Sequence, residues 1–421
     1  MGCGNVGSAL AELLLTRQDD IVARTGIRLE LVGIAVSGAG RARPASIPGD
    51  LFGTDAAALV VREDVDVVVE LIGGLQPAQQ FIEAALRAGK PVVTANKAVL
   101  AVAGAELADL ADARGVDLLY EAAVAGAVPI VRTLRESLAG EQIVRVMGIV
   151  NGTTNFILTR MEEDGMDFAD ALAEAQRLGL AERDPTADVE GHDAAAKAAI
   201  LAALAFGSDV VDVDVHREGI SGIRAVDVAY ANRLGYSVKL LAVAELVDGG
   251  PELSVRVHPA MVPKDHPLAS VRGAFNAVFV EGAVSGELML YGRGAGGEPT
   301  ASAVLGDLVD AARNLRAGAP APAPKRTSIT VRPQPELRSA FYLSIDVTEG
   351  LGVLAAVAKV FGDHKVSIRA MEQVGWDDEA RLIFLTHKAR EGDLLGTIDE
   401  LRLLQAVDRV GGVLRVIGEE E

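Results

Sequence analysis

The sequence predicts an α/β protein built from three parts: a doubly wound parallel sheet, an α+β domain with a mixed sheet, and a ferredoxin-like βαββαβ module. Strand and helix patterns alternate through residues 1–128, as they do in doubly wound sheets. Beyond Gly140, helical patterns cluster and several β-rich segments follow. Residues 341–417 then read strand, helix, strand, strand, helix, strand, which is the order of the ferredoxin-like module.

The length and composition agree with this division. A chain of 421 residues is too long for one hydrophobic core. Hydrophobic residues make up 50% of the chain and aromatic residues only 4%, so Ala, Val and Leu must fill the core, as suits helices packed on a parallel sheet. The formal net charge of -19 opposes binding to nucleic acid or to anionic lipid surfaces.

The chain is predicted to be cytoplasmic and to lack a membrane span. The longest apolar stretches, such as 65–75, are too short to cross a bilayer and are interrupted by acidic residues. The N-terminus lacks the basic and apolar regions of a secretory signal. The single cysteine, Cys3, cannot form an internal disulfide. The six histidines show no pair at zinc-ligand spacing, so a zinc enzyme is not expected.

Hydrophobic periodicity predicts the elements of residues 1–128. They are a helix at 8–24, a strand at 29–36, a strand at 65–71, a helix at 78–88, a strand at 91–94 and a helix at 100–113. A glycine turn precedes the first helix, because Gly2, Gly4 and Gly7 form the pattern G-x-G-x-x-G. Such a turn lets backbone amides approach a pyrophosphate at a helix N-terminus, which predicts a Rossmann-like domain for NAD or NADP. A purely structural corner is the alternative.

The expected nucleotide contacts at this turn are Gly2, Gly4, Asn5, Val6 and Gly7. The strand that normally precedes such a turn is missing, because the chain begins one residue before the first glycine. That strand usually lies at the sheet centre. We therefore expect exposed edges on its two neighbours and a poorly anchored turn, and we interpret the start as a misassigned start codon or a truncated sequence.

The loop after the strand at 29–36 bears on the choice of nucleotide. An acidic residue usually binds the ribose 2′-hydroxyl there, but this chain has Ser37, Arg41 and Arg43 instead. A hydroxyl and two guanidinium groups suit a 2′-phosphate and favour NADP over NAD. Two solvated loop arginines are the alternative, so the preference stays open.

The rest of the chain is assigned in the same way. The predicted elements are a strand at 143–150, helices at 156–161, 169–178 and 194–206, strands at 253–257 and 277–284, and a helix at 301–315. A Pro/Ala run at 316–324 is a linker. The resulting parts are 1–128, 129–300, a helix at 301–317 that returns to the first part, a linker at 318–338, and 339–421.

Asp193 and Lys197 lie four residues apart on a predicted helix and so share one face. The carboxylate could hold the ammonium and tune its pKa, which would provide a proton relay for an alcohol oxygen. An isolated pair at this spacing is equally typical of a surface salt bridge.

The segment 175–197 resembles the homoserine dehydrogenase family at every fixed position of that family's signature. These positions are Ala175, Gly179, Pro185, Asp188, Gly191, Asp193 and Lys197. The blocks 148–156, 94–97 and 294–300 are also similar to the family, and the resemblance covers nearly all of residues 1–317. It implies NAD(P)-dependent interconversion of L-homoserine and L-aspartate 4-semialdehyde in threonine, methionine and isoleucine biosynthesis, by a homodimer or homotetramer.

The resemblance also implies roles for individual residues. Lys197 would be the acid/base lysine with Asp193 as its partner, Glu182 would bind the amino group of the substrate, and Lys97 would lie beside nicotinamide and substrate. Further residues are Asp188 and Thr153 for the substrate, and Thr94, Asn96 and Gly296 for the cofactor. A developing alkoxide needs a cation or proton donor, which agrees with these roles. For Lys97, capping of a strand end is the alternative.

A monovalent cation site is a further implication of the resemblance. It would consist of Glu121 and the carbonyl groups of Val124, Gly126 and Val128, and would hold a sodium ion. A turn of small residues before Pro129 is explained equally well by chain reversal.

The C-terminal part is similar to the ACT domain, in which a glycine turn between the first strand and first helix takes an amino acid. Here the strand at 341–347 is followed by Gly350 and Gly352, with Leu351 where the family usually has proline. The implied effector is a pathway end product such as threonine, and a structural or dimerising role is the alternative.

Two other functions are alternatives. Aspartate-semialdehyde dehydrogenase needs a cysteine nucleophile, but the only cysteine here lies in the glycine turn. An amino-acid sensor that derives from such an enzyme and has lost catalysis stays open.

Overall fold

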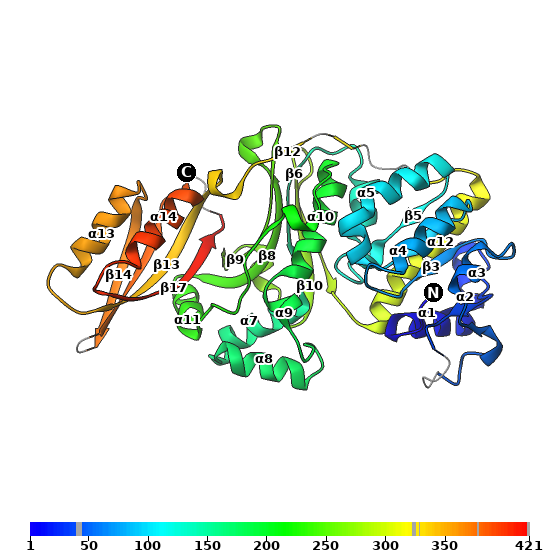
Figure 1. Cartoon of the computed structure of the whole chain (residues 1–421), viewed down its shortest axis with the longest axis horizontal. Coiled ribbons are helices and arrows are strands. Elements are labelled where there is room, and N and C mark those ends of the chain that lie inside the picture. Colours follow the sequence, from blue (N-terminus) through cyan, green and yellow to red (C-terminus); the bar gives the residue numbers. More distant parts are fainter. Residues whose placement is uncertain (39–43, 322–325, 328, 377–378, 419–421) are drawn as a thin grey trace.

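The computed structural model describes residues 1–38, 44–321, 326–327, 329–376 and 379–418. Three parts follow one another along the long axis of the molecule (Figure 1). The N-terminal part lies at one end, the central domain in the middle and the C-terminal module at the other end. Helix α12, which is far along the sequence, lies with the N-terminal part.

The N-terminal part contains short parallel strands and covering helices. Its elements are α1 Asn5–Thr16, α2 Gln18–Thr25, β1 Ile34–Ala35, β2 Phe52–Gly53, α3 Ala56–Val61, β3 Val68–Glu70, α4 Ala78–Arg87, β4 Val92–Thr94, α5 Lys97–Arg114 and β5 Leu118–Leu119. The strands form two separate parallel sheets, β1-β2 and β3-β4-β5. Helix α12 (Gly297–Ala317) packs against α1. The alternating pattern predicted from the sequence is confirmed.

Two predicted elements in this part differ from the structure. The single helix predicted at 8–24 is broken at Arg17, which separates α1 from α2. The strand predicted at 29–36 pairs with a neighbour only over β1. Regular strand assignment needs a hydrogen-bonding neighbour, and in the described chain β1 pairs with β2 alone.

The central domain is a sheet with helices on one face. Its strands are β6 Ile143–Ile149, β7 His216–Arg217, β8 Tyr236–Leu246, β9 Glu252–Pro263, β10 Phe275–Gly282 and β11 Gly286–Arg293. Its helices are α6 Ile130–Arg132, α7 Gly152–Asp164, α8 Phe168–Arg177, α9 Thr186–Val189, α10 His192–Phe206 and α11 Ala225–Arg233. The sheet order is β11-β10-β6-β8-β9 with antiparallel neighbours, and β7 adds a parallel pairing to β9. The predicted mixed sheet is confirmed.

The C-terminal module has the predicted βαββαβ order, with one additional two-residue strand before its second helix. Its elements are β13 Arg338–Thr348, α13 Val353–Asp363, β14 Ile368–Trp376, β15 Glu379–Thr386, β16 Ala389–Arg390, α14 Glu391–Leu401 and β17 Val407–Val416. Sequence analysis did not predict how the module joins the central domain. Strand β17 pairs in parallel with β9, through Arg415 opposite Ala260 and Val416 opposite Met261, so one sheet continues through both parts.

Part of the predicted linker forms regular structure. Within 318–338, β12 (Thr330–Val331) pairs in parallel with β9, and β13 already begins at Arg338. The Pro/Ala composition disfavours regular structure only over the run itself, and its first two residues complete α12.

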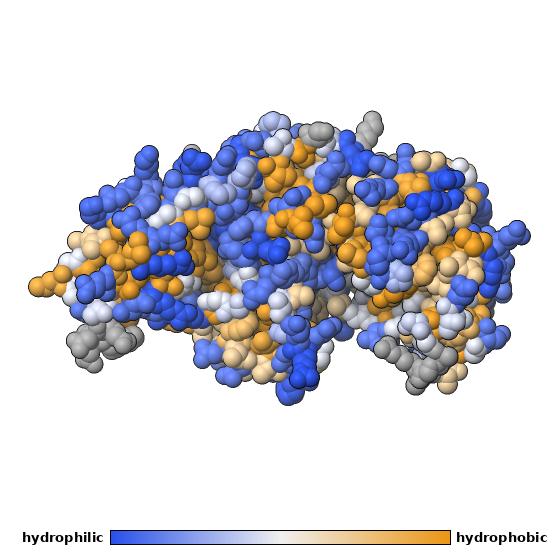
Figure 2. All heavy atoms as spheres, viewed as in Figure 1, coloured by the Kyte–Doolittle hydropathy of each residue, from blue (hydrophilic) through white to orange (hydrophobic). Residues whose placement is uncertain are grey.

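No helix in the described part of the chain is long and apolar enough to cross a membrane. On the face drawn in Figure 2, polar and apolar side chains are interspersed across all three parts. This mixture is ordinary for a protein surface that faces water.

Candidate functional site

Lys197 and Asp193 form a buried pair on α10, one helical turn apart. The Nζ of Lys197 donates to Oδ2 of Asp193 at 2.7 Å and to the carbonyl oxygen of Val150 at 2.6 Å. The side chains of Lys197 and Asp193 are only 12% and 11% exposed. The surface salt bridge that remained open from the sequence is therefore wrong, because a solvated pair at this spacing would be largely exposed.

Lys97 reaches the same carboxylate from the N-terminal part. Its Nζ lies 3.1 Å from Oδ1 of Asp193, so the two lysines bind opposite oxygens of one carboxylate. Lys97 is the first residue of α5, whose N-terminus is capped by the side chain of Asn96. Capping of a strand end does not describe Lys97, because its ammonium is directed at Asp193 across the boundary between two parts of the chain.

The electrostatics of this cluster keep Asp193 ionised. Burial works against the charge, but the ammonium groups of Lys197 and Lys97 and a hydrogen bond from Asn151 outweigh it. Together they hold the pKa of the Asp193 carboxyl well below its usual range. The carboxylate can therefore position two cations and compensate their charge.

Two asparagines complete the cluster, and sequence analysis assigned a role to neither. Nδ2 of Asn151 donates to Asp193 at 2.9 Å and to Asp188 at 2.7 Å. Nδ2 of Asn276 donates to the same Val150 carbonyl that Lys197 contacts, at 3.1 Å. The only available signal was that Asn151 lies within the block 148–156. Asn276 lies on β10, and no local pattern connects it with α10.

The Oδ1 atom of Asn276 is buried and has no hydrogen-bond partner among the described residues. Gly294 makes room for this side chain, because a Cβ at that position would lie 2.1 Å from the Asn276 side-chain carbon. The block 294–300 therefore lies against the site, and the lack of a side chain at Gly294 leaves space for Asn276.

The expected substrate residues differ in burial and in their hydrogen bonds to the cluster. Asp188 is partly buried, and burial raises the pKa of its carboxyl against the opposing hydrogen bond from Asn151. The hydroxyl of Thr153 donates to the Leu180 carbonyl at 2.7 Å, which ties α7 to the loop after α8. Glu182 is on that loop, with an exposed side chain and a carbonyl that accepts from Gln176. The structure brings Asp188 to the cluster through Asn151, whereas no hydrogen bond joins Glu182 to it in the described residues.

The glycine turn has the close contacts that its sequence predicts. A Cβ at Gly2, where φ is +87°, would lie 2.5 Å from the Leu71 carbonyl, and one at Gly7 would lie 2.4 Å from the Gly2 carbonyl. Gly4, the N-cap of α1, has open space around it. Asn5 and Val6 begin α1, so the N–H groups of a twelve-residue helix face that space.

A buried carboxylate that sequence analysis missed organises the neighbouring strand ends. Glu70 is fully buried at the end of β3 and accepts from the Thr94 hydroxyl at 2.7 Å and from the Ile72 amide at 2.6 Å. The Thr94 hydroxyl in turn accepts from the Asn96 amide. The expected cofactor residues Thr94 and Asn96 thus lie at the carboxyl ends of parallel strands, where open α/β sheets bind ligands.

Other expected cofactor contacts are only partly described. Gly296 precedes α12, and its neighbour Gly297 faces the Asn5 carbonyl, at 3.0 Å from the position of a Cβ. This places the 294–297 loop beside the glycine turn. Ser37 is exposed just after β1, and Arg41 and Arg43 lie outside the described residues.

The loop expected to hold a cation is organised by hydrogen bonds within the protein. Both carboxylate oxygens of Glu121 accept backbone amides, from Val131 at 2.8 Å and Arg132 at 2.9 Å. Gly126 has a φ of +63° and packs against the Gly294 carbonyl. Chain reversal accounts for both features, and no cluster of His, Cys, Asp or Glu suited to a metal occurs among the described residues. A sodium ion at Glu121, Val124, Gly126 and Val128 stays a prediction.

Comparisons with known proteins agree with this geometry. Residues 2–121 match the model for the homoserine dehydrogenase NAD-binding domain, and 129–309 match the model for homoserine dehydrogenase. The homoserine dehydrogenase of Corynebacterium glutamicum is 51% identical over 99% of this chain and 94% of its own length. That of Mycobacterium tuberculosis is 48% identical over 99% and 97%.

Solved structures give the same result. A homoserine dehydrogenase from Thiobacillus denitrificans superposes with a TM-score of 0.93 at 40% identity, covering 99% of this chain and 96% of that one. A hyperthermophilic archaeal homoserine dehydrogenase in complex with NADPH superposes with a TM-score of 0.62 at 30% identity, covering 74% and 96%. The chain therefore belongs to the homoserine dehydrogenase family, oxidoreductases that act on a CH–OH group.

Proposed function

We propose that this chain interconverts L-homoserine and L-aspartate 4-semialdehyde in the cytoplasm, as a step of threonine, methionine and isoleucine biosynthesis. The observation that carries the proposal is the cluster of the largely buried Lys197 and Asp193 with the half-exposed Lys97, which joins the central domain to the nucleotide part. A bound nicotinamide would supply the hydride acceptor or donor at this boundary. An inactive sensor would have no need for a largely buried lysine whose charge is compensated by an aspartate.

The lysines account for the proton that accompanies hydride transfer. When the alcohol is oxidised, hydride leaves the carbon and the hydroxyl proton must leave the oxygen. Lys197 is the acceptor in this scheme, and it returns the proton to the oxygen in the reverse direction. Two ammonium groups share one carboxylate, so Lys197 can be neutral while Asp193 remains paired with Lys97.

The remaining substrate contacts are proposals of the same kind. An amino-acid substrate carries an ammonium group, and the carboxylates proposed to bind it are Glu182 and Asp188, of which Asp188 contacts the cluster through Asn151. Thr153 fixes the loop that carries Glu182. A Glu182→Gln variant should raise KM for homoserine with a smaller effect on kcat, because the contact would exist in ground and transition states alike.

For the cofactor we propose NADP, with NAD as the weaker alternative. The pyrophosphate would bind the amides of Gly2, Gly4 and Gly7 at the start of α1, with Asn5, Val6, Thr94, Asn96, Lys97 and Gly296 around it. Ser37, Arg41 and Arg43 would bind the 2′-phosphate. The NADPH complex of the archaeal relative supports a nicotinamide cofactor.

A direct assay tests the reaction. Homoserine-dependent reduction of NADP and NAD should be observed, with kcat/KM higher for NADP. L-serine, which is one methylene shorter, serves as the matched substrate and should be oxidised at a much lower rate. No turnover of homoserine with either nucleotide would refute the proposed activity.

We also propose that the C-terminal module is an ACT domain that binds an amino acid such as threonine. Its support is the βαββαβ order and the turn of Gly350, Leu351 and Gly352 between β13 and α13. An ion network links the module to the central domain: Arg415 on β17 donates to Glu391 and to Glu218, at 2.7 Å in each case. Glu218 precedes Gly219, where a Cβ would lie 2.5 Å from the carbonyl oxygen of Val189, which is four residues before Asp193.

Kinetics of the full chain with and without threonine test this regulation. The full chain is needed because loss of the module would expose the β9 edge that pairs with β17. Gly350→Asp should abolish inhibition, because a carboxylate in the turn would repel the carboxylate of the effector. Gly362→Ala on α13, where there is open space, is the matched control. Equal inhibition of both variants would exclude the turn as the site.

The oligomer is proposed to be a homodimer or homotetramer. Its support is the outermost strand of the sheet, β11, which exposes Leu288, Met289 and Tyr291. Sedimentation velocity measures the assembly directly, and a monomer at micromolar concentration would refute it.

A further inference from the structure

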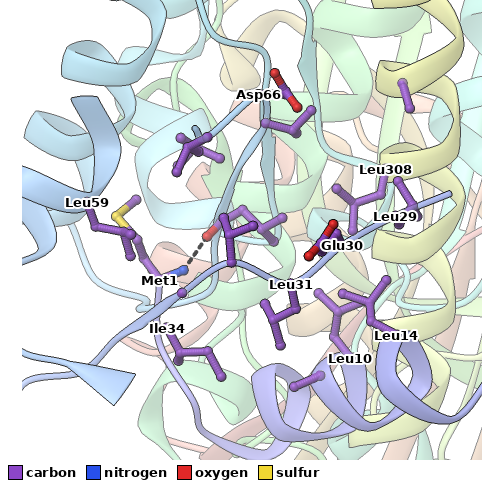
Figure 3. A pocket seen from close by; sticks show the side chains of 18 of the residues that line it. Met1, Leu10, Leu14, Leu29, Glu30, Leu31, Ile34, Leu59, Asp66 and Leu308 are labelled. Atoms are coloured by element: carbon purple, nitrogen blue, oxygen red, sulfur yellow. Dashed lines mark hydrogen bonds between the residues drawn. The ribbon is translucent and has the colours of Figure 1, made fainter. Parts of the chain in front are cut away.

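Strand β3 presents its two faces to different surroundings. Val69 and Leu71 line a cavity of about 750 Å³ together with Leu10 of α1 (Figure 3). Successive side chains of a strand point to opposite faces, so Glu70 points away from this cavity. The register of β3 and β4 places Glu70 opposite Thr94, and both side chains are fully buried. Glu70 therefore belongs to the polar contacts at the carboxyl ends of β3 and β4, not to the cavity.

Three hydrogen bonds from the described residues reach the Glu70 carboxylate, and each partner is a donor. The amides of Ile72 and Gly73 donate to Oε1 at 2.6 and 3.3 Å, and the Thr94 hydroxyl donates to Oε2 at 2.7 Å. The direction of the Thr94 bond is fixed, because the Thr94 oxygen also accepts from the Asn96 amide at 3.0 Å, and an amide N–H can only donate. A carboxylate, which accepts at both oxygens, is the group that satisfies all three partners.

These bonds connect Glu70 with Lys97 through Asn96. The Asn96 side chain caps the N-terminus of α5. Its Nδ2 donates to the Gly74 carbonyl at 2.8 Å, so Asn96 is also tied to the turn whose amides Glu70 binds. Lys97 is the next residue and the first of α5. The main-chain position from which Lys97 reaches Asp193 is therefore set by the Glu70 contacts.

The Lys97 ammonium depends on this main-chain position more than the Lys197 ammonium depends on its own. The Lys97 side chain is 44% exposed, and its Nζ lies 3.1 Å from Oδ1 of Asp193. Lys197 is 12% exposed and is held by both Asp193 and the Val150 carbonyl. A displacement of about 1 Å near reacting groups can cost about 10²-fold in rate, so a shift at the start of α5 would affect turnover.

We propose that Glu70 is a positioning residue for the reaction proposed above: through Thr94 and Asn96 it fixes the start of α5, so that the Lys97 ammonium meets Asp193. Because Glu70 is fully buried, it acts through these residues and not by contact with substrate or cofactor. The inference rests on the proposed oxidation of homoserine, which is the step that a displaced Lys97 would slow.

Glu70→Gln tests this role with little change in the size of the side chain. The remaining oxygen can still accept from the two turn amides, but the NH₂ group donates toward Thr94. Two donors then face the Thr94 oxygen, and its hydroxyl hydrogen loses its acceptor, so the start of α5 must shift. We expect kcat for homoserine oxidation to fall about tenfold with a smaller change in KM. The isotope effect on kcat for homoserine deuterated at the oxidised carbon should rise, because hydride transfer becomes more nearly rate-limiting.

Two comparisons separate positioning from stability. Asp117→Asn changes another buried carboxylate, which accepts from the Asn314 side chain at 2.9 Å and from the Ala321 amide at 2.7 Å. Asp117 precedes β5 and so lies at the opposite end of the parallel strands. Its variant should lower the thermal unfolding midpoint without changing kcat or the isotope effect. In a Lys97→Ala chain, Glu70→Gln should lower kcat by less than about twofold, because the residue through which it acts is absent.

An equal fold loss in the parent and Lys97→Ala chains would overturn the inference. A Glu70→Gln protein that is less stable but keeps the parent kcat and isotope effect would overturn it as well. Should Glu70→Gln not fold, Thr94→Val removes the linking hydroxyl at nearly the same size and is judged by the same measurements.

Amide hydrogen exchange in residues 95–99 provides a measurement that needs no turnover. Exchange there should be faster in Glu70→Gln than in the parent chain and in Asp117→Asn, and unchanged exchange would count against the role of Glu70. A parent chain that does not oxidise homoserine would refute the proposed function, and hydrogen exchange would still decide whether Glu70 fixes the start of α5.

Discussion

The ion pair between Asp193 and Lys197 should show strong energetic coupling. Asp193 accepts hydrogen bonds from Lys197 at 2.7 Å and from Asn151 at 2.9 Å, and it forms an ion pair with Lys97 at 3.1 Å. Its side chain is 11% exposed. Asp193→Asn would leave two ammonium groups close together without their anion. Breaking a buried pair in this way costs about 3–5 kcal/mol of unfolding free energy. In a Lys197→Met background only one ammonium remains, so the same change should cost less, by about 2 kcal/mol.

A double-mutant cycle by chemical denaturation at pH 7 measures this difference. The matched control is Lys359 with Asp363, an i,i+4 pair on α13 whose side chains are 74% and 49% exposed. The control pair should show no measurable coupling, because water screens both charges. The Asp193 carboxyl has a lowered pKa in the folded state, so its stabilisation is present above its ordinary range near pH 4 and is lost as the pH falls. A coupling in the cluster as small as that of the control would refute the reasoning.

Three other predictions concern Lys97, Arg415 and Asp307. Lys97→Ala should lower kcat/KM for homoserine by at least about tenfold in steady-state assays, since it removes the cation that bridges two parts of the chain; unchanged kinetics would contradict this. Arg415→Met leaves Glu218 without its guanidinium and Glu391 with Arg256 as its remaining guanidinium partner. It should reduce the unfolding free energy by about 3–5 kcal/mol, which an unaltered melting midpoint would disprove. Burial raises the pKa of Asp307 to about 7, so the folded state binds more protons than the unfolded state between about pH 4 and 7, and stability should fall as pH rises through that window. Asp307→Asn should flatten this dependence, and a wild-type profile that is already flat would argue against it.

Local spacing was sufficient to predict part of the site. Asp193 and Lys197 share a face because an α-helix repeats every 3.6 residues, so their contact was accessible from the sequence. The burial of the pair could not be predicted from the sequence, because it depends on what packs over α10. The contact between Lys97 and Asp193 joins residues far apart in sequence and was not predicted, because the resemblance to a family implied only that Lys97 lies beside nicotinamide and substrate.

The contacts of Asn276 and Glu70 could not be predicted from the local sequence. Asn276 contacts the carbonyl of Val150 because β10 and β6 are neighbours in the sheet, and strand order has no local signature. Glu70 contacts Thr94 for the same reason, through β3 and β4. An apolar run predicts that a strand exists, but its partner depends on the whole sheet.

The junction between the central domain and the C-terminal module was also beyond sequence reasoning. The order of elements in the module was predicted from periodicity, and the Pro/Ala run indicated only a linker. Pairing of β17 with β9 and the buried Arg415 instead make the module an extension of the central sheet. Edge pairing needs only two compatible backbones, so the side-chain pattern does not reveal it.

Turnover of a Lys197→Met variant tests the central claim most directly. With homoserine and NADP at saturation, we predict a loss of about 10²–10⁴-fold in kcat, while the circular dichroism spectrum stays that of the parent chain. Lys359→Met, the exposed lysine of the control pair, should retain full turnover. A Lys197→Met protein that is folded and oxidises homoserine at the parent rate would contradict the assignment of Lys197 as the residue that handles the alcohol proton.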